Sequence, residues 1–320
     1  MHNIETINGK AQMAYAGEVP WHGLGTKVPA DLTSTQMLEA AGLDWKVSKI
    51  PAFADVNGVS IDVGHSALVR DLDSKILDVV SNDWNPVQNE EAFEFFNDFV
   101  MAGDMEMHTA GSLQEGKIVW ALAKVKDSFS LFKGDQVDSY LLFTNFHKYG
   151  CSVDLRFQPI RVVCNNTLTL ALDSKVDRMV KMSHRRKFNP DKVKEMLGIA
   201  KEKMQEYRER AEFLGSTMAS NDNLALYFKN VFPVTGAPKD GKVPKDMSRN
   251  ATQAMNVMET QPGSEFAPGS WWQAYNAVSF MTDHIVGRSN DTRMASSWYG
   301  VNKGTKLRAL DLAIEFAEAA

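Results

Sequence analysis

The sequence is poor in cysteine, because only Cys151 and Cys164 occur among its 320 residues. So few thiols fit a reducing compartment and argue against a disulfide framework, although a single bond between these two stays open. The chain also lacks an apolar run of the roughly 18 residues that a membrane helix needs. Its N-terminus has no basic segment followed by an apolar one, so we expect no secretory signal. These absences predict a cytoplasmic protein with no membrane partner.

Signature motifs of catalysis are missing as well. The sequence has no phosphate-binding G-x-x-x-x-G-K-[ST] loop, which argues against ATP-driven chemistry, and no G-x-S-x-G setting for a nucleophile. The spacing of His147, Cys151 and Cys164 is not that of a zinc site. We therefore expect no catalytic residue, no metal and no cofactor, while the sequence leaves open whether the protein is an enzyme.

Charge is distributed unevenly along the chain. The net charge is −5, but residues 1–140 sum to about −11, residues 141–190 to about +6 and the remainder to about zero. The acidic total therefore hides one basic segment, and this segment is the part of the sequence best suited to bind a polyanion.

The first half predicts an antiparallel β meander. Extended runs cover residues 45–56, 59–63, 67–70 and 75–80, and Asn57-Gly58 is a strong hairpin signal. Before them, Thr33 and Gln36 predict a capping box on a short helix that ends near Gly42. A helix over residues 89–101 with a stripe of phenylalanines follows the meander, and residues 105–113 and 117–125 form a further hairpin.

Helices dominate the last part of the sequence. Asn189-Pro190 predicts the start of a helix. Its heptad-like seam is expected to pack against the protein's own body, and a dimeric coiled coil is the less favoured alternative. That seam consists of Val193, Leu197, Ala200, Met204, Tyr207, Ala211 and Leu214. Further helices are expected over residues 271–286 and 306–319, with a loop at about 234–268. The fold class is therefore α+β, with an antiparallel meander and a β-β-β-α core in residues 1–188 and a mainly helical region in residues 189–320.

The stretch from Ser139 to Leu172 has the clearest alternation. It predicts a hairpin that turns at His147-Lys148-Tyr149-Gly150, with one apolar face that is buried. The opposite face would carry Arg156 and Arg161, with Lys148 at the tip and the ring of His147 facing solvent or stacking.

This hairpin and the basic run after it form the candidate binding site. Cationic side chains could neutralise phosphates, and Phe146, His147 and Tyr149 could stack on bases, which is the usual physics of single-strand binding. The predicted nucleic-acid-binding residues are Lys148, Tyr149, Arg156, Arg161, Arg185, Arg186 and Lys187. A solvated face and linker is an equally weighted alternative.

Two other functions stay open. Asp71, Asp73, Asp78 and Asp83 lie close together in sequence and could hold a divalent metal in an enzyme that acts on nucleotides or nucleic acid. Aspartate is also favoured at strand ends and turns for local hydrogen bonds, and we prefer that interpretation. Alternatively, the protein binds a host protein through its helical part.

Four strings resemble one protein family. They are Pro20–Gly25, Thr109–Leu113, Arg161–Leu168, and Ala274–Val278 with Asp283-His284. Together they are similar to a phage- and plasmid-borne family catalogued as a domain of unknown function. The resemblance spans nearly the whole chain and implies an origin in a bacteriophage or mobile element, with a location in the host bacterial cytoplasm. It brings no catalytic residues.

The order of elements is also similar to the core of single-strand annealing proteins. Such proteins need no ATP, form rings or filaments and bind DNA along a basic groove, although the acidic first half of this chain departs from that pattern. We therefore expect a phage protein that binds single-stranded DNA as a homo-oligomer, in a ring or filament, and promotes annealing or recombination.

Overall fold

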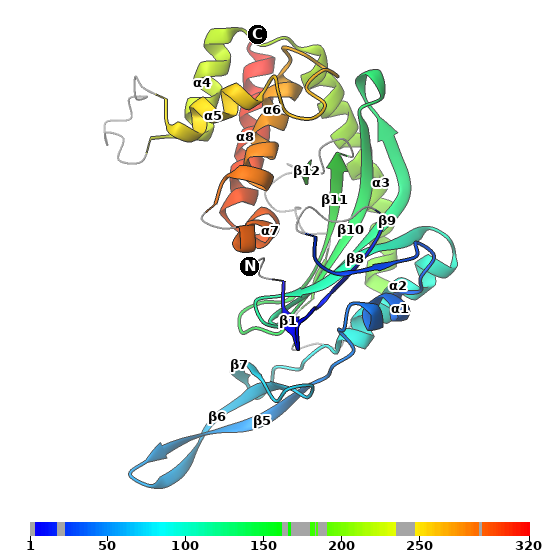
Figure 1. The fold of residues 1–320 in the computed structure, drawn as a ribbon, viewed down its shortest axis with the longest axis vertical. Coiled ribbons are helices and arrows are strands. Elements are labelled where there is room, and N and C mark those ends of the chain that lie inside the picture. The colour runs from blue at the N-terminus through cyan, green and yellow to red at the C-terminus, as the bar shows by residue number, and fades with distance from the viewer. Residues whose placement is uncertain are drawn as a thin grey trace. The chain divides into compact units, whose positions relative to one another are not determined.

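The computed structural model describes residues 4–17, 23–161, 166–167, 180–182, 184, 191–234, 247–287 and 290–320 (Figure 1). Helices and strands alternate in the first half, and helices fill the second, so the predicted α+β class is confirmed. The strands are β1 (Thr6–Ile7), β2 (Lys10–Ala11), β3 (Met13–Ala16), β4 (Thr26–Val28), β5 (Val47–Val56), β6 (Val59–Arg70), β7 (Ile76–Ser81), β8 (Met105–Leu113), β9 (Ile118–Ser130), β10 (Gln136–Phe146), β11 (Val153–Arg161), β12 (Asn166–Thr167) and β13 (Val180–Met182). The helices are α1 (Ser34–Ala40), α2 (Asn89–Met101), the 3-10 turn η1 (Phe132–Gly134), α3 (Asp191–Ser216), α4 (Asn221–Val231), α5 (Arg249–Val257), α6 (Trp271–Phe280), the π-helical turn η3 (Met281–Ile285), α7 (Asn290–Tyr299) and α8 (Val301–Glu318).

One large sheet has the strand order β12-β11-β10-β9-β8-β3-β4, with β13 paired to β11. Its described pairings are antiparallel apart from β3 with β4, which run parallel. A separate antiparallel sheet has the order β5-β6-β7. In Figure 1, β5 and β6 continue together beyond β7 as a long two-stranded arm.

The chain divides into two compact units that are interleaved in sequence. Unit 1 comprises Met1–Lys126, Tyr140–Phe157 and Arg178–Ile199, and unit 2 comprises Asp127–Ser139, Gln158–Asp177 and Ala200–Ala320. The sequence predicts one division near residue 188, with each region a single continuous stretch. Each of these units is instead assembled from three stretches of the chain.

Local signals explain the elements of unit 1. Thr33 and Gln36 form the predicted capping box, because each side chain bonds the other's backbone N–H at the start of α1. Helix α2 buries Phe93 and Phe96, and the ring of Phe96 meets Phe143 of β10 edge to face at 6.0 Å. Burying each such ring stabilises the fold by on the order of 2 kcal/mol.

Unit 2 is organised around α6, which is buried on all sides from Trp271 to Ser279. The ring of Trp271 stacks on Phe316 of α8 at 5.3 Å, and Trp272 donates from Nε1 to the Asp135 carboxylate at 3.0 Å. Tyr207 of the α3 seam packs edge to face against Trp272. The described part of the seam, from Met204 to Leu214, is therefore buried against the protein itself, as predicted.

Three helices depart from the predicted pattern. The predicted loop at about 234–268 was wrong in part, because α5 lies within it and begins at the side-chain cap of Ser248. Helices α4 and α7 were not predicted.

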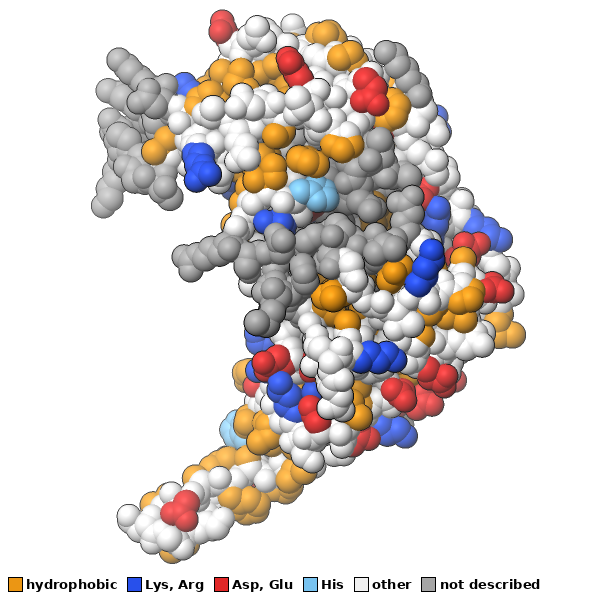
Figure 2. All heavy atoms as spheres, in the orientation of Figure 1, with side chains coloured by type: hydrophobic (Ala, Val, Ile, Leu, Met, Phe, Trp, Pro, Cys, Tyr) orange, Lys and Arg blue, Asp and Glu red, His pale blue; other side chains and the backbone are white. Residues whose placement is uncertain are grey.

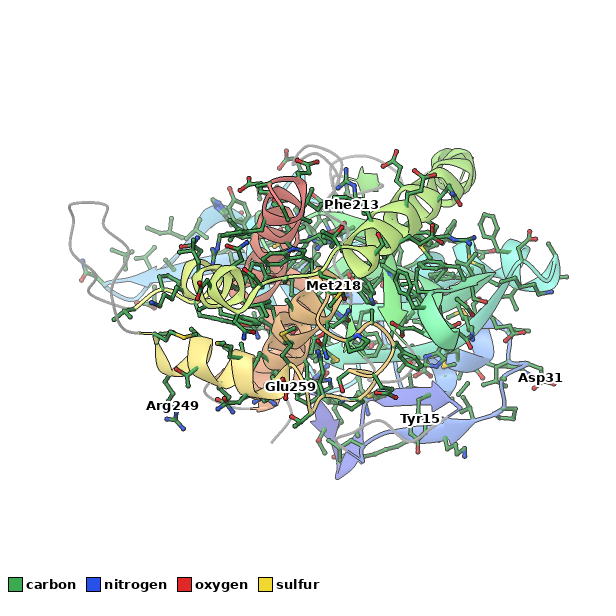
Figure 3. All side chains as sticks on the ribbon, turned by 90° about the horizontal axis from the view of Figure 1, so that it is seen from above. Tyr15, Asp31, Phe213, Met218, Arg249 and Glu259 are labelled. Carbon is green, nitrogen blue, oxygen red and sulfur yellow. The ribbon has the colours of Figure 1, made fainter. Side chains whose placement is uncertain are left out.

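The side chains of Phe213 and Met218, at the end of α3 and just beyond it, are exposed (Figure 3).

Candidate nucleic-acid interface

The turn between β10 and β11 presents a lysine and an aromatic ring to solvent. Gly150 has φ +73°, which few other residues adopt, and it closes the turn as predicted. Lys148 is exposed and Tyr149 is 58% exposed. The backbone N–H of Tyr149 donates to Asp78 of β7 at 2.8 Å, so the turn is held in place while the ring remains open. This geometry suits stacking and phosphate contact.

The start of the basic run is fixed beside this turn. Strand β13 pairs with β11 through Met182 opposite Val153, three residues after Gly150. His184 is anchored on the same unit, because its backbone C=O accepts from Asn85 at 2.9 Å and its ring stacks on Trp84 at 4.0 Å. The predicted site residues Arg185, Arg186 and Lys187 lie outside the described residues, but they follow His184 directly in the chain.

Arg156 does not belong to an exposed basic face. It is 5% exposed, and its guanidinium bonds the carboxylate of Asp154, two residues earlier on β11. Residues i and i+2 of a strand share a face, so the two charges are buried together. The prediction of an open polar face was therefore wrong here, because β10 and β11 are buried on both faces over most of their length. The backbone of Arg161 pairs with Asn166 of β12, and its side chain lies outside the described residues.

The prediction that the ring of His147 faces solvent was also wrong. Its ring is fully buried, with Nε2 at 3.0 Å from the Asn89 side-chain oxygen and the ring of Trp45 at 5.3 Å. Burial lowers the pKa of His147 to about 3, with smaller effects from His184 and Arg70. Burial likewise lowers the pKa of His184 to about 4. Both rings are uncharged at neutral pH, so neither adds positive charge to the interface.

A second buried ionic group lies in unit 1. Arg70 donates to Glu5 at 2.8 Å and to Asp73 at 2.7 Å, and it lies over the ring of Trp45. Burial alone would lower the pKa of Arg70, but its bonds to Asp73 and Glu5 outweigh burial and raise it. This arginine is structural, because it is 1% exposed and paired on two sides.

The aspartates considered as metal ligands are held by local hydrogen bonds. Asp71 accepts from Lys46 N–H at 2.8 Å, Asp78 accepts from Val79 and Tyr149, and Asp83 accepts from the Ser81 hydroxyl. Asp73 binds Arg70. Within the described ranges, no three His, Cys, Asp or Glu side chains are grouped as metal ligands.

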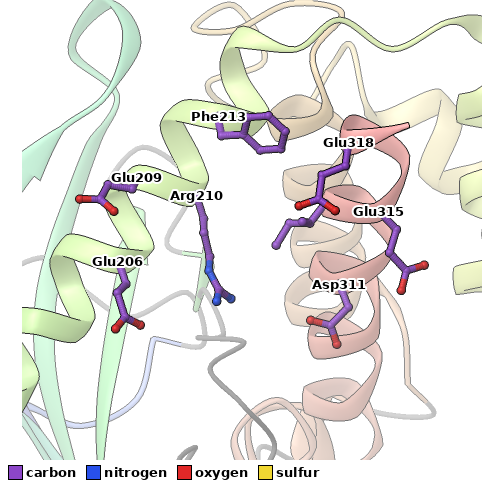
Figure 4. Close-up of a pocket in the computed structure, with 8 residues that line it drawn as sticks. Glu206, Glu209, Arg210, Phe213, Asp311, Glu315 and Glu318 are labelled. Atoms are coloured by element: carbon purple, nitrogen blue, oxygen red, sulfur yellow. The ribbon is translucent and has the colours of Figure 1, made fainter. Parts of the chain in front are cut away.

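An open groove of about 650 Å³ lies between α3 and α8 in unit 2 (Figure 4). Its polar lining consists of Glu206, Glu209, Arg210, Asp311, Glu315 and Glu318. Burial raises the pKa of Asp311, and nearby Glu315 adds to this, whereas Arg210 opposes it. Five carboxylates against one guanidinium repel phosphate, so this groove is not a nucleic-acid site.

Among the described residues, no helix combines the length and the apolar character required to cross a bilayer.

A family described as a domain of unknown function (DUF932) matches residues 76–298. The chain belongs to this DUF932 family. The match covers the turn between β10 and β11, β13 and the basic run. No curated protein and no solved structure matches the chain.

Proposed function

We propose that this DUF932 protein is a phage-encoded, ATP-independent protein that binds single-stranded DNA as a homo-oligomer and promotes annealing or recombination. The observation that supports it best is the pairing of Met182 with Val153, because it ties the basic run to the turn that displays Lys148 and Tyr149. The cations of the proposed interface are Lys148, Arg185, Arg186 and Lys187, with Tyr149 as the stacking ring. Arg156 is left out because it is buried, and Arg161 because it belongs to unit 2, whereas the turn and the basic run belong to unit 1.

Salt dependence provides the test. Four phosphate contacts give a slope of about −3 for the logarithm of affinity against the logarithm of salt concentration, since each contact on a single strand contributes about −0.7. Fluorescence polarisation of a labelled oligonucleotide, titrated at several salt concentrations, measures this slope. Absence of binding at about 50 mM salt would sink the proposal. A strand-pairing assay with a fluorophore and a quencher on complementary oligonucleotides, without ATP, then tests annealing.

A second candidate function is binding of a host protein through the helical unit. The observation that favours it is the acidic groove between α3 and α8, which fits a basic partner segment. A charge reversal such as Glu209→Lys would weaken capture of that partner and leave oligonucleotide binding unchanged. Failure to capture any protein partner, together with oligonucleotide binding that Glu209→Lys leaves unchanged, would assign the binding activity to the turn between β10 and β11.

A further inference from the structure

The arm of the β5-β6-β7 sheet has one face that is apolar and uncovered. Residues that pair across antiparallel strands point to the same face, and so do residues two apart along a strand. Ile50, Ala52, Ala54 and Val56 alternate along β5, and Ala54 and Val56 pair with Ile61 and Val59 of β6. Nearer the body of unit 1, Ile50 pairs with Ala67, which pairs with Val79 of β7. The register of β6 and β7 then shifts by one residue, so Val69 pairs with Ile76 and brings it to the same face. We call this the outer face, and it consists of Ile50, Ala52, Ala54, Val56, Val59, Ile61, Ala67, Val69, Ile76 and Val79.

The outer face is largely open to solvent. Six of its aliphatic side chains, those of Ile50, Val56, Val59, Ile61, Ile76 and Val79, are 46–60% exposed. Figure 2 shows hydrophobic side chains gathered along the arm. The exposed area comes to on the order of 500 Å², which is near the upper end for the largest apolar patch of a monomer. It also supplies more than half of the roughly 800 Å² that each partner buries in an interface of standard size.

The two faces of the sheet differ in charge. None of the residues of the outer face is charged, so two copies of it can meet without like-charge repulsion. The opposite face is buried near the body of unit 1, at Leu68 and Val80, but at the arm's end it carries Asp55 and Asp62. Two copies of that end would repel. Only the outer face is therefore complementary to itself.

Pairing through the strand edge is less favourable than pairing through the face. Strand β7, one edge of the sheet, carries Asp78, and strand β5, the other edge, contains Pro51, which has no N–H to donate. Lys49 and Asp55 on the same strand are charged, and charges on an edge strand discourage its extension by another strand. What remains is face-to-face packing of two sheets about 10 Å apart, as in a β-sandwich.

We infer that the outer face of β5-β6-β7 is a homodimer interface, in which a second copy of this chain packs its own outer face on the first about a twofold axis. Only residues of the β5-β6-β7 sheet form this interface, and the proposed dimer does not depend on nucleic-acid binding.

The test compares two substitutions on opposite faces of the arm. Val59 lies on the outer face, Phe53 lies opposite Asp62 on the other face, and both are 60% exposed. In analytical ultracentrifugation across a wide concentration range, the unaltered protein is expected to reach twice the mass of the 35.7 kDa chain. Val59→Lys should raise the dimer dissociation constant at least about tenfold, whereas Phe53→Lys should leave it unchanged. Circular dichroism should show unchanged folding in both variants, because neither side chain is buried.

Three results would overturn the inference. They are a single-chain mass at all concentrations, a dimer that survives Val59→Lys, and equal weakening by Phe53→Lys. A monomer that sediments with anionic phospholipid vesicles through Val59 would assign the face to a lipid surface instead. Ammonium sulfate should strengthen the dimer, since burial of apolar surface is favoured by such salts, whereas salt weakens phosphate contacts. Failure of the dimer and failure of oligonucleotide binding are thus distinguishable.

Discussion

The guanidinium of Arg156 is bound to the carboxylate of Asp154, and both side chains are almost completely buried within β11. A basic residue at this position could contact DNA only if its side chain were exposed to solvent. Its role is therefore to neutralise a buried carboxylate, and its contribution is to stability.

Removing Arg156 should destabilise the protein without weakening DNA contacts. Arg156→Ala leaves Asp154 charged and buried, which costs about 3–5 kcal/mol. The double variant Arg156→Met with Asp154→Asn should recover much of this loss, because it removes both charges. Urea denaturation measures the free energies of unfolding. A stable Arg156→Ala variant with reduced oligonucleotide affinity would return Arg156 to the interface.

Tyr149 and Lys148 should contribute to oligonucleotide binding but not to stability. Stacking on one base is worth about 1–3 kcal/mol, so Tyr149→Ala should lower affinity roughly 5- to 150-fold. Lys148→Ala should lower the salt slope by about 0.7. Tyr149→Phe keeps the ring and serves as the matched control. Equal affinity for the alanine and phenylalanine variants would show that this ring does not stack on DNA.

The buried histidines should make the fold less stable in acid. Their folded-state pKa values, about 3 for His147 and about 4 for His184, lie below the ordinary value of 6.5. Between these values the unfolded chain binds protons that the folded chain does not, so stability is full above about pH 6.5 and is lost as the pH falls. The slope approaches about 1.4 kcal/mol per pH unit for each histidine.

Replacing His147 isolates its share of this effect. His147→Gln retains an amide that can donate to Asn89 and removes the titration. The loss of stability between pH 7 and pH 5 should then shrink by on the order of 2 kcal/mol. His65→Gln alters an exposed histidine of β6 and serves as the control. An unchanged pH profile for His147→Gln would mean that folding does not lower the pKa of this ring.

Two helical glycines should respond in opposite ways to alanine. A Cβ at Gly215 of α3 would lie 2.0 Å from the ring of Phe132, whereas a Cβ at Gly304 of α8 meets nothing within 4 Å. Gly215→Ala forces that ring to move and should destabilise unit 2 by about 1–3 kcal/mol. Gly304→Ala should stabilise it by about 0.5–1 kcal/mol, because alanine is the better helix former. Thermal unfolding of both variants measures the difference, and a shift of the same sign in both would contradict it.

Elements defined by local chemistry were predictable from the sequence. Asn57-Gly58 places the turn between β5 and β6, and the spacing of the phenylalanines predicts α2 from its first residue to its last. Ser220, whose side chain caps α4, is the local sequence signal for the start of that helix.

Features that depend on distant residues were not predictable. His147 is buried because Asn89, 58 positions earlier, lies against it. The exposed outer face of the arm has the same alternation as a strand that is covered. For Arg156, the only local signal was the two-residue spacing from Asp154, which puts both on one side of a strand.

Because the two units are interleaved in sequence, few cuts of the chain would give a fragment that contains a whole unit. A fragment that ends near residue 199 would keep Asp127–Ser139 but lose Ala200–Ala320, the rest of the same unit. Asp135 would then lose the hydrogen bond that Trp272 donates to it, and the apolar surface around it would be exposed to water. Trimming of loops should be tolerated, whereas expression of either half alone should yield insoluble protein.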